Sequence, residues 1–339
     1  MIMLNYFNLF LWFMMNNSMI ISISSNSIIS IWMGMEMNML TFSSMLIFNS
    51  FYYKNSSIKY FLIQSFSSMI LMYFFFLISM NNNFLNLNFS LIMINFMIIM
   101  KMGLPPLFNW YLNLMNNLNW NNCLNISIIQ KIIPFYLMNF MLNFNNLIIN
   151  NMNLLLLMMS MMFCSINSMK QILLKMIFSY SSIIHTSWMI FILMFNETLW
   201  MIYFLTYSFI SISLMMFFKM YNMNFINNFM LLKKNIFKIM FFINILTISG
   251  LPPFMGFLMK WLSASLLINK MNFFILILFT LNSLIMMFYY LRIFFNSMMF
   301  FNNMNKFNIN NMNLFIKSNK YIFYINIFSI MNLLYYEMF

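Results

Sequence analysis

The sequence has no aspartate, no valine, one alanine and one histidine, and only 6% of its 339 residues are charged. Because soluble domains carry about 25% charged residues, this content excludes an ordinary soluble fold. One histidine and two distant cysteines, Cys123 and Cys164, cannot supply a four-cysteine iron–sulfur site, a bis-histidine haem or an aspartate-rich metal site. The sequence also lacks dinucleotide-binding and P-loop motifs. We therefore expect free, inert thiols and no cofactor or metal in this chain.

Hydrophobic residues make up 64% of the chain and include 47 methionines and 46 phenylalanines. Several runs contain no charge, namely residues 1–35, 60–100, 132–169, 198–218 and 239–259. Each run reaches the roughly 18 to 20 residues that a helix needs to cross the bilayer. The composition therefore predicts an all-α, polytopic membrane protein.

The residue bias indicates where the chain is encoded. Residues with A/T-rich codons have displaced those with G/C-rich ones, and methionine is as frequent as expected if a second, A/T-rich codon is read as methionine. Animal mitochondria use such a code. We interpret the chain as a mitochondrially encoded inner-membrane protein with an insect-like base bias.

Asparagine-rich and lysine-bearing breaks divide the chain into about eleven expected helices. These are residues 3–23, 26–48, 58–80, 89–111, 121–143, 147–167, 172–194, 197–218, 238–260, 271–297 and 320–337. No soluble domain fits between them, so residues 1–339 are expected to form a single transmembrane domain. Lysines gather in the even-numbered loops, which predicts an N-terminus in the matrix and a C-terminus in the intermembrane space. They form no basic stripe, so nucleic-acid binding is not expected.

All glycines and prolines, four and five in number, lie in four places, each with an ionisable residue in an apolar context. These places are Gly34 before Glu36; Gly103, Pro105 and Pro106 after Lys101; Pro134 after Lys131; and Gly250, Pro252, Pro253 and Gly256 before Lys260. The tetrapeptide Gly-Leu-Pro-Pro occurs at 103–106 and again at 250–253, and its prolines should break both helices. Two interrupted spans in two halves of a chain are typical of transporters built from inverted repeats.

Charged residues inside these spans are the candidate site. Each costs about 2.5 to 3.5 kcal/mol near the bilayer centre unless it is paired or hydrated. A glutamate and lysines in such surroundings can exchange protons when their spacing changes. Glu36, Lys101, Lys131 and Lys260 therefore form a candidate proton relay, with His185 as a further member.

Structural roles for the same residues stay open. Glu36 and Lys101 could form a static ion pair that only fixes helix packing. Lys260 could extend to the membrane surface, and His185 could be a hydrogen-bonded core residue.

At these positions the chain resembles the NADH dehydrogenase subunit 2 family, antiporter-like membrane-arm subunits of mitochondrial respiratory complex I. The matching stretches run in the family's order and are residues 32–40, 59–64, 101–110, 130–134, 180–188 and 250–261, ending near Tyr290-Leu291-Arg292. Animal members look like the bacterial subunit without three N-terminal helices, which agrees with eleven spans.

The resemblance also implies roles for the matching residues. Glu36 is similar to the family's intramembrane glutamate and Lys101 to its partner on the first broken helix. Lys131 resembles the central lysine, and Lys260 the lysine of the second broken helix that hands protons onward. The chain departs from the family pattern at three positions, where Phe108 replaces a histidine, Ser187 a glycine and Met259 a proline.

The resemblance implies a core subunit that translocates protons across the inner membrane, as part of a proton-translocating NADH:ubiquinone reductase. Electron transfer, with NADH, FMN, iron–sulfur clusters and ubiquinone, then belongs to other subunits. The implied partners are membrane-arm subunits on both sides, accessory subunits and lipids such as cardiolipin. Two alternatives stay open: a structural scaffold whose charges only fix helix packing, and a stand-alone cation/proton antiporter, which the absence of aspartate disfavours.

Overall fold

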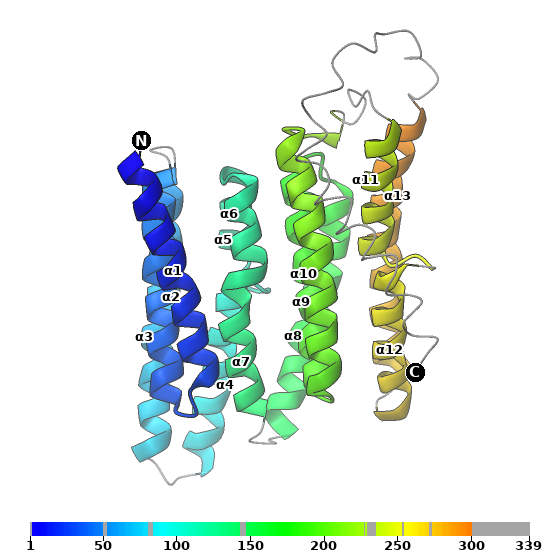
Figure 1. Cartoon of the computed structure of the whole chain (residues 1–339). Helices are drawn as coiled ribbons and strands as arrows, with labels where there is room; N and C mark the ends of the chain where they lie inside the picture. Colours follow the sequence, from blue (N-terminus) through cyan, green and yellow to red (C-terminus); the bar gives the residue numbers. More distant parts are fainter. Residues whose placement is uncertain are drawn as a thin grey trace. The chain divides into compact units, whose positions relative to one another are not determined.

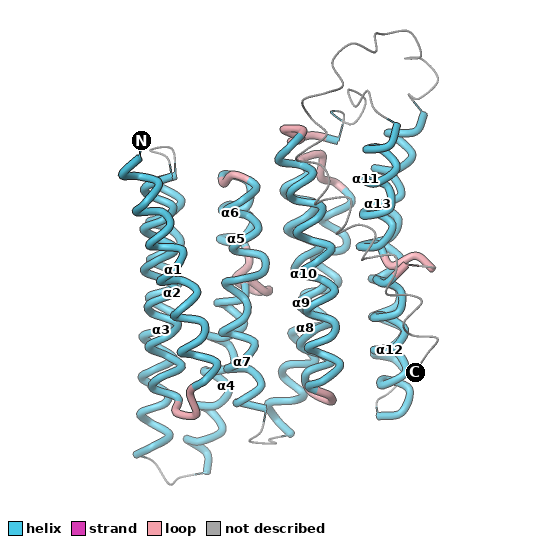
Figure 2. Tube along the Cα trace, in the orientation of Figure 1, coloured by secondary structure: helices cyan, strands magenta, loops and turns pink. Residues whose placement is uncertain are grey.

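The structure is a computed structural model that describes residues 2–49, 53–80, 84–142, 147–226, 228, 235–252, 254–270 and 273–299. Its regular elements in these ranges are helices joined by short connections, apart from one isolated bridge between Leu173 and Phe225 (Figures 1 and 2). The prediction of an all-α protein is confirmed for this part of the chain. The expected helix at 320–337 lies outside the described residues.

The chain divides into two compact units, Met1–Ser160 and Met161–Phe339. The helices of the first unit are α1 (Ile2–Ser24), α2 (Ile28–Asn49), α3 (Lys54–Met80), α4 (Phe84–Met102), α5 (Asn109–Asn117), α6 (Trp120–Leu124), the π-helix η2 (Asn125–Ile129), α7 (Gln130–Leu142) and the first half of α8 (Leu147–Met169). Within this unit α7 packs against α1, α2 and α4. Lys131, at the start of α7, is therefore surrounded by other helices.

Close packing of α1 on α2 depends on a small residue. A Cβ atom at Gly34 would lie 2.8 Å from the Cβ atom of Ser22 and 2.9 Å from the carbonyl oxygen of Ser18. Small residues let helices approach closely in membranes, where packing replaces the hydrophobic drive for association. Gly34 therefore lets α2, the helix that carries Glu36, pack closely on α1.

The second unit contains the rest of α8, α9 (Leu174–Leu193), α10 (Glu197–Met220), α11 (Asn235–Ser249), α12 (Met255–Lys270) and α13 (Phe273–Met299). Residues on every side of α9 are buried from Ile177 to Leu193, so α9 forms the core of this unit. Its hydroxyl side chains bond to carbonyl groups of the preceding turn, as Ser181 does to Phe178 and Thr186 to Ile183. These bonds satisfy polar groups inside an apolar helix.

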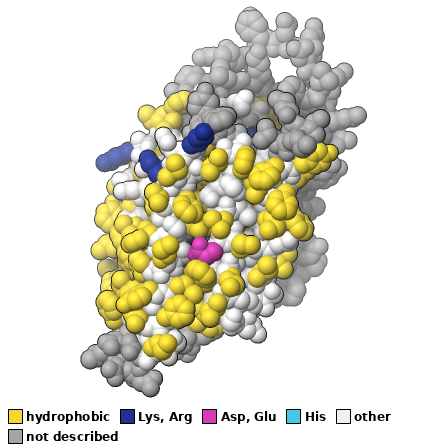
Figure 3. Space-filling view, turned by 90° about the vertical axis from the view of Figure 1, so that its left-hand side faces the viewer, with side chains coloured by type: hydrophobic (Ala, Val, Ile, Leu, Met, Phe, Trp, Pro, Cys, Tyr) yellow, Lys and Arg dark blue, Asp and Glu magenta, His cyan; other side chains and the backbone are white. Residues whose placement is uncertain are grey.

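Six helices of the described residues are long and apolar enough to cross a membrane: Lys54–Met80, Trp120–Leu142, Asn150–Met169, Leu174–Leu193, Glu197–Met220 and Phe273–Phe295. Hydrophobic side chains cover much of the described surface in Figure 3, where the basic side chains gather toward one end. A surface of this kind suits contact with lipid.

Both spans expected to be interrupted are broken. The expected helix at 89–111 is α4 and α5, separated by residues 103–108 that include Pro105 and Pro106. The expected helix at 238–260 ends instead at Ser249, and α12 begins at Met255 and runs to Lys270. The predicted end at residue 260 is wrong because apolar periodicity alone does not place the restart of a helix after a break. Lys260 consequently lies inside α12 and not at a helix end.

Candidate functional site

Lys101 lies in the last turn of α4, immediately before the first break. Gly103 takes a positive φ of 75°, a conformation that glycine adopts without steric cost. The carbonyl oxygen of Lys101 accepts a hydrogen bond from Nε2 of Gln64 at 3.3 Å. The Gln64 side chain from α3 thus satisfies a carbonyl group at the broken end of α4, where the helix offers no amide partner.

Glu36 of α2 lies close enough to Lys101 and Tyr60 to interact electrostatically with both. Among the described residues, the buried Oε1 atom of Glu36 has no hydrogen-bond partner. Nζ of Lys101 contacts Sδ of Met35 at 3.8 Å. The two charges therefore interact through space without a direct hydrogen bond, and their separation can change without breaking one.

A polar network links three helices beside these charges. Gln130, the first residue of α7, accepts a hydrogen bond from Oη of Tyr60 at 2.9 Å and donates one to Oδ1 of Asn38 at 3.0 Å. Tyr60, Asn38 and Gln130 line a cavity of about 20 Å³ together with Gln64 and Lys101. A site needs roughly 10 to 15 Å³ to hold a water molecule, so this cavity has room for about one, with several polar partners.

Lys131 is the most enclosed of the candidate lysines, with 2% of its surface exposed. Within the described part of the chain its Nζ atom has no hydrogen-bond partner, and it lies 4.8 Å from the centre of the Tyr111 ring. The ring face attracts a cation without fixing it in one geometry. The π-helix Asn125–Ile129 ends one residue before Gln130, and such segments often mark functional positions in helices.

The first Gly-Leu-Pro-Pro motif makes room for that ring. A Cβ atom at Gly103 would lie 2.8 Å from the Cβ atom and 2.9 Å from the Cγ atom of Tyr111. The ring of Tyr111 is in turn the group that Lys131 faces. Gly103 therefore leaves the space for the aromatic ring that Lys131 faces.

In the second unit, Lys260 of α12 turns back onto the end of α11. Its Nζ atom donates a hydrogen bond to the carbonyl oxygen of Ser249 at 2.7 Å. Ser249 is the last residue of α11, and the free carbonyl groups at a helix C-terminus carry partial negative charge that favours a cation. The break after Ser249 thus supplies the acceptor for the lysine.

His185 is buried in α9, with 5% of its surface exposed. Its Nδ1 atom lies 2.9 Å from Oη of Tyr203 in α10, a hydrogen bond that fixes the orientation of the imidazole ring. The ring of Tyr207 lies 5.3 Å away, centre to centre. The two tyrosines enclose the histidine on the side of α10.

The candidate residues therefore fall into two sets. Glu36, Lys101 and Lys131 belong to the first unit, and His185 and Lys260 to the second. The role of the polar partners was not assigned from the sequence: Asn38, Tyr60, Gln64, Tyr111, Gln130 and Tyr203. A polar side chain inside an apolar helix is common in this asparagine- and serine-rich chain, so it does not single out Asn38 or the tyrosines. Glutamine, in contrast, occurs only at positions 64, 130 and 171, and this rarity could have singled out Gln64 and Gln130. The described residues contain no cluster of three or more histidine, cysteine and acidic side chains that could hold a metal ion.

The sequence and the fold match known proteins. Residues 25–286 match the family model described as NADH:quinone oxidoreductase/Mrp antiporter, TM. The chain is 37% identical over 281 residues to NADH-ubiquinone oxidoreductase chain 2 of Anopheles gambiae, covering 81% of each chain. It is 35% identical over 320 residues to the same protein of Aedes aegypti, covering 90% of this chain and 92% of the relative. The chain belongs to the NADH-ubiquinone oxidoreductase chain 2 family.

Solved structures show that the fold is shared with more distant proteins. A chain of respiratory complex I from Thermus thermophilus superposes with a TM-score of 0.84 at 16% identity, covering 97% of this chain and 78% of that one. A chain of the archaeal membrane-bound sulfane sulfur reductase gives the same TM-score, covering 96% and 72%. The resemblance to the chain 2 family read from the sequence is confirmed, and the fold is that of the antiporter-like membrane subunits.

Proposed function

We propose that this chain is a membrane-arm subunit of a respiratory NADH:ubiquinone oxidoreductase and moves protons across the mitochondrial inner membrane. Its relatives carry the name of a subunit of that enzyme. Its own candidate residues are proton carriers and not redox groups. Electron transfer, with NADH, FMN, iron–sulfur clusters and ubiquinone, takes place in other subunits and drives the movement of protons here.

The observation that carries the proposal is the setting of Lys131. This lysine is buried in the middle of a 23-residue apolar span, and its Nζ atom faces an aromatic ring and has no hydrogen-bond partner among the described residues. An ammonium group without a fixed counter-ion can release its proton without breaking an ion pair. A lysine that served only to fix helix packing would be expected to pair with an anion.

The remaining candidate residues act before or after Lys131 in the proposed order of proton transfer. Glu36 and Lys101 act as a charge switch at the first broken helix, and the cavity beside them holds the water that transfers the proton. Lys260 is the exit or linking site at the second broken helix, supported by His185. The repeated Gly-Leu-Pro-Pro supports an inverted-repeat arrangement. The charge-poor runs support about eleven spans in one transmembrane domain, and the lysines in alternate loops support an N-terminus in the matrix and a C-terminus in the intermembrane space. Membrane-arm subunits on both sides, accessory subunits and lipids such as cardiolipin are the proposed partners.

A structural scaffold is the second candidate, and the Gln130 network favours it. Gln130 joins α7 to α2 and α3 by two side-chain hydrogen bonds, so it locks helices together as a scaffold requires. In that case the buried charges would matter for assembly and not for transport.

Replacing Lys131 with alanine in the assembled complex separates the two candidates. The control is Lys59→Ala, which removes an exposed lysine of α3. We expect Lys131→Ala to lower the number of protons moved per electron in proteoliposomes, while Lys59→Ala leaves that ratio unchanged. If Lys131→Ala assembles fully and pumps at the normal ratio, this lysine does not carry protons and the scaffold is favoured.

A further inference from the structure

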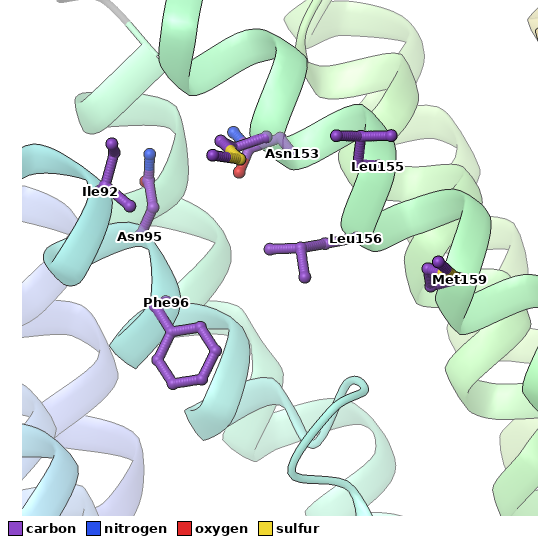
Figure 4. A pocket seen from close by; sticks show the side chains of 8 residues that line it. Ile92, Asn95, Phe96, Asn153, Leu155, Leu156 and Met159 are labelled. Carbon is purple, nitrogen blue, oxygen red and sulfur yellow. The ribbon is translucent and has the colours of Figure 1, made fainter.

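A pocket of about 350 Å³ lies between α4 and the first half of α8, within the first unit (Figure 4). Its walls come from both helices and include Ile92, Asn95, Phe96, Asn153 and Leu156. The α4 residues recur at i, i+3 and i+4 and so share one face of that helix. The pocket is thus a widening of a groove between two helices, and none of the residues proposed to carry protons lines it.

Two asparagines in this pocket are deeply buried, with 4% of Asn95 and 1% of Asn153 exposed. Among the described residues, neither Oδ1 nor Nδ2 of Asn95 has a hydrogen-bond partner, and Nδ2 of Asn153 has none. Figure 4 shows the two side chains on facing helices at the pocket. Buried amide groups are normally hydrogen-bonded because leaving them unpaired costs free energy. The pocket therefore offers hydrogen-bond donors and an acceptor that another molecule can use.

The depth of the pocket in the membrane limits which kind of molecule can fill it. Asn95 is eleven residues after Phe84, the start of α4, which places it about 16 Å along the helix axis. With the start of α4 at the membrane surface, that distance is about half the thickness of the hydrocarbon core. Lipid headgroups lie nearer the membrane surface, and acyl chains have no polar group to offer at this depth. The partner must bring its own polar group into the hydrocarbon.

The unpaired hydrogen-bonding atoms of the two asparagines further limit which polar group the partner can bring. Asn95 leaves both a donor and an acceptor vacant, and a hydroxyl or amide group can satisfy both, whereas an ester oxygen only accepts. In membrane proteins such groups come from serine, threonine, asparagine or glutamine side chains that bond across helices. The vacant hydrogen-bond positions therefore fit a polar side chain carried by a transmembrane helix.

The rim of the pocket fits a helix as well. Met152, Leu155 and Met159 of α8 are exposed and recur at i, i+3 and i+7, so they form one apolar stripe along the groove. Methionine side chains adapt to the shape of a neighbour. A helix lying along the stripe would place one side chain between the two asparagines.

We propose that the groove between α4 and α8 seats a transmembrane helix of a neighbouring membrane-arm subunit, which inserts an amide or hydroxyl side chain between Asn95 and Asn153. This inference rests on the proposed function in one respect, namely that the chain works inside a complex of several membrane subunits. It adds the surface, the depth and the chemistry of the contact.

A structure of the intact native complex tests the contact directly. We expect a nitrogen or oxygen atom from a side chain of another subunit within hydrogen-bond distance of the Asn95 amide. A lipid, a water cluster or a side chain of this same chain in the pocket would overturn the proposal.

Substitution tests the energetic role of the contact. Asn95→Leu with Asn153→Leu removes the polar groups without leaving a buried amide unpaired, so the chain itself should still fold. We expect the neighbouring subunit to dissociate in detergent about three to ten times faster than in wild type, as for the loss of one interhelical hydrogen bond. The control is Asn113→Leu, which changes an exposed asparagine of α5.

The same variants distinguish this inference from the proposed function. In complexes that remain intact, Asn95→Leu with Asn153→Leu should leave the number of protons moved per electron unchanged, whereas Lys131→Ala should lower it. If the neighbouring subunit dissociates from the double variant as slowly as from wild type, the proposed helix contact at Asn95 and Asn153 is wrong. The proposed proton pathway is unaffected by that result.

Discussion

Lys260 lies directly against Gly250, because a Cβ atom at Gly250 would be 2.7 Å from Nζ and 2.9 Å from Cε of the lysine. The glycine at the second broken helix therefore leaves the space in which the lysine reaches the carbonyl oxygen of Ser249. At the first broken helix, Gly103 of the same tetrapeptide contacts Tyr111, which faces Lys131. In both units the repeated motif determines where a buried lysine can lie.

Gly250→Ala should displace the Lys260 side chain and lower the number of protons moved per electron. The added methyl group occupies the position of the lysine, and the φ of 75° adds about 1 to 2 kcal/mol of backbone strain for any L-residue. Proton pumping in proteoliposomes measures the effect, with Ser265→Ala at an exposed position of α12 as the control. Normal pumping by a fully assembled Gly250→Ala complex would show that the position of Lys260 is unimportant.

Tyr111→Leu should impair proton pumping more than Tyr111→Phe. Phenylalanine keeps the aromatic face that Lys131 meets at 4.8 Å, whereas leucine removes it. The interaction is worth about 0.5 to 2 kcal/mol, so its loss changes how readily the lysine holds its proton. Pumping ratios of the two variants at equal assembly give the comparison. Equal ratios for the two would mean that the ring acts only by filling space.

Gln130→Leu should weaken the packing of α7 against α2 and α3. The change removes the hydrogen bonds to Tyr60 and Asn38 and leaves their polar groups buried without that partner. Interhelical hydrogen bonds in membranes contribute about 0.6 to 2 kcal/mol each. Thermal unfolding of the complex should therefore begin at a lower temperature than in wild type. Tyr60→Phe, which removes one of the two bonds, should have a smaller effect, and the reverse order would contradict this account.

Tyr203→Phe tests whether the orientation of His185 matters for pumping. The variant removes the hydroxyl group that lies 2.9 Å from Nδ1 and keeps the ring beside the imidazole. If His185 supports proton transfer, Tyr203→Phe should lower the pumping ratio in the same direction as His185→Gln and by less. If His185→Gln lowers the pumping ratio and Tyr203→Phe does not, the imidazole group matters for pumping and its hydrogen bond to Tyr203 does not.

The sequence predicted the features that depend on local chemistry. Pro105 and Pro106 cannot continue a helix, and α4 ends before them as expected. The absence of charge over long stretches predicted apolar helices, six of which meet the criteria for crossing a membrane within the described residues. The ionisable residues near the breaks were visible for the same reason, since they stand out in apolar runs.

Contacts between distant residues could not be read from the sequence. Tyr203 meets His185 across two helices, and Tyr60 meets Gln130 although 70 residues separate them. The local sequence does not say which residues meet, because each pair joins side chains from two different helices. The π-helix before Gln130 was missed as well, since its residues follow the same apolar pattern as an α-helix. The sequence was enough to propose a role for the lysines inside the spans. The side chains that orient these lysines could be identified only from the fold.

The glycines of this chain limit how far its gene can drift in base composition. Glycine codons begin with two guanines, and mutation toward adenine and thymine replaces them. At Gly34, Gly103 and Gly250 any replacement meets a neighbouring serine, tyrosine or lysine, and at Gly256 it meets the carbonyl oxygen of Thr247. We therefore expect these codons to keep their guanines even where the rest of the gene loses them.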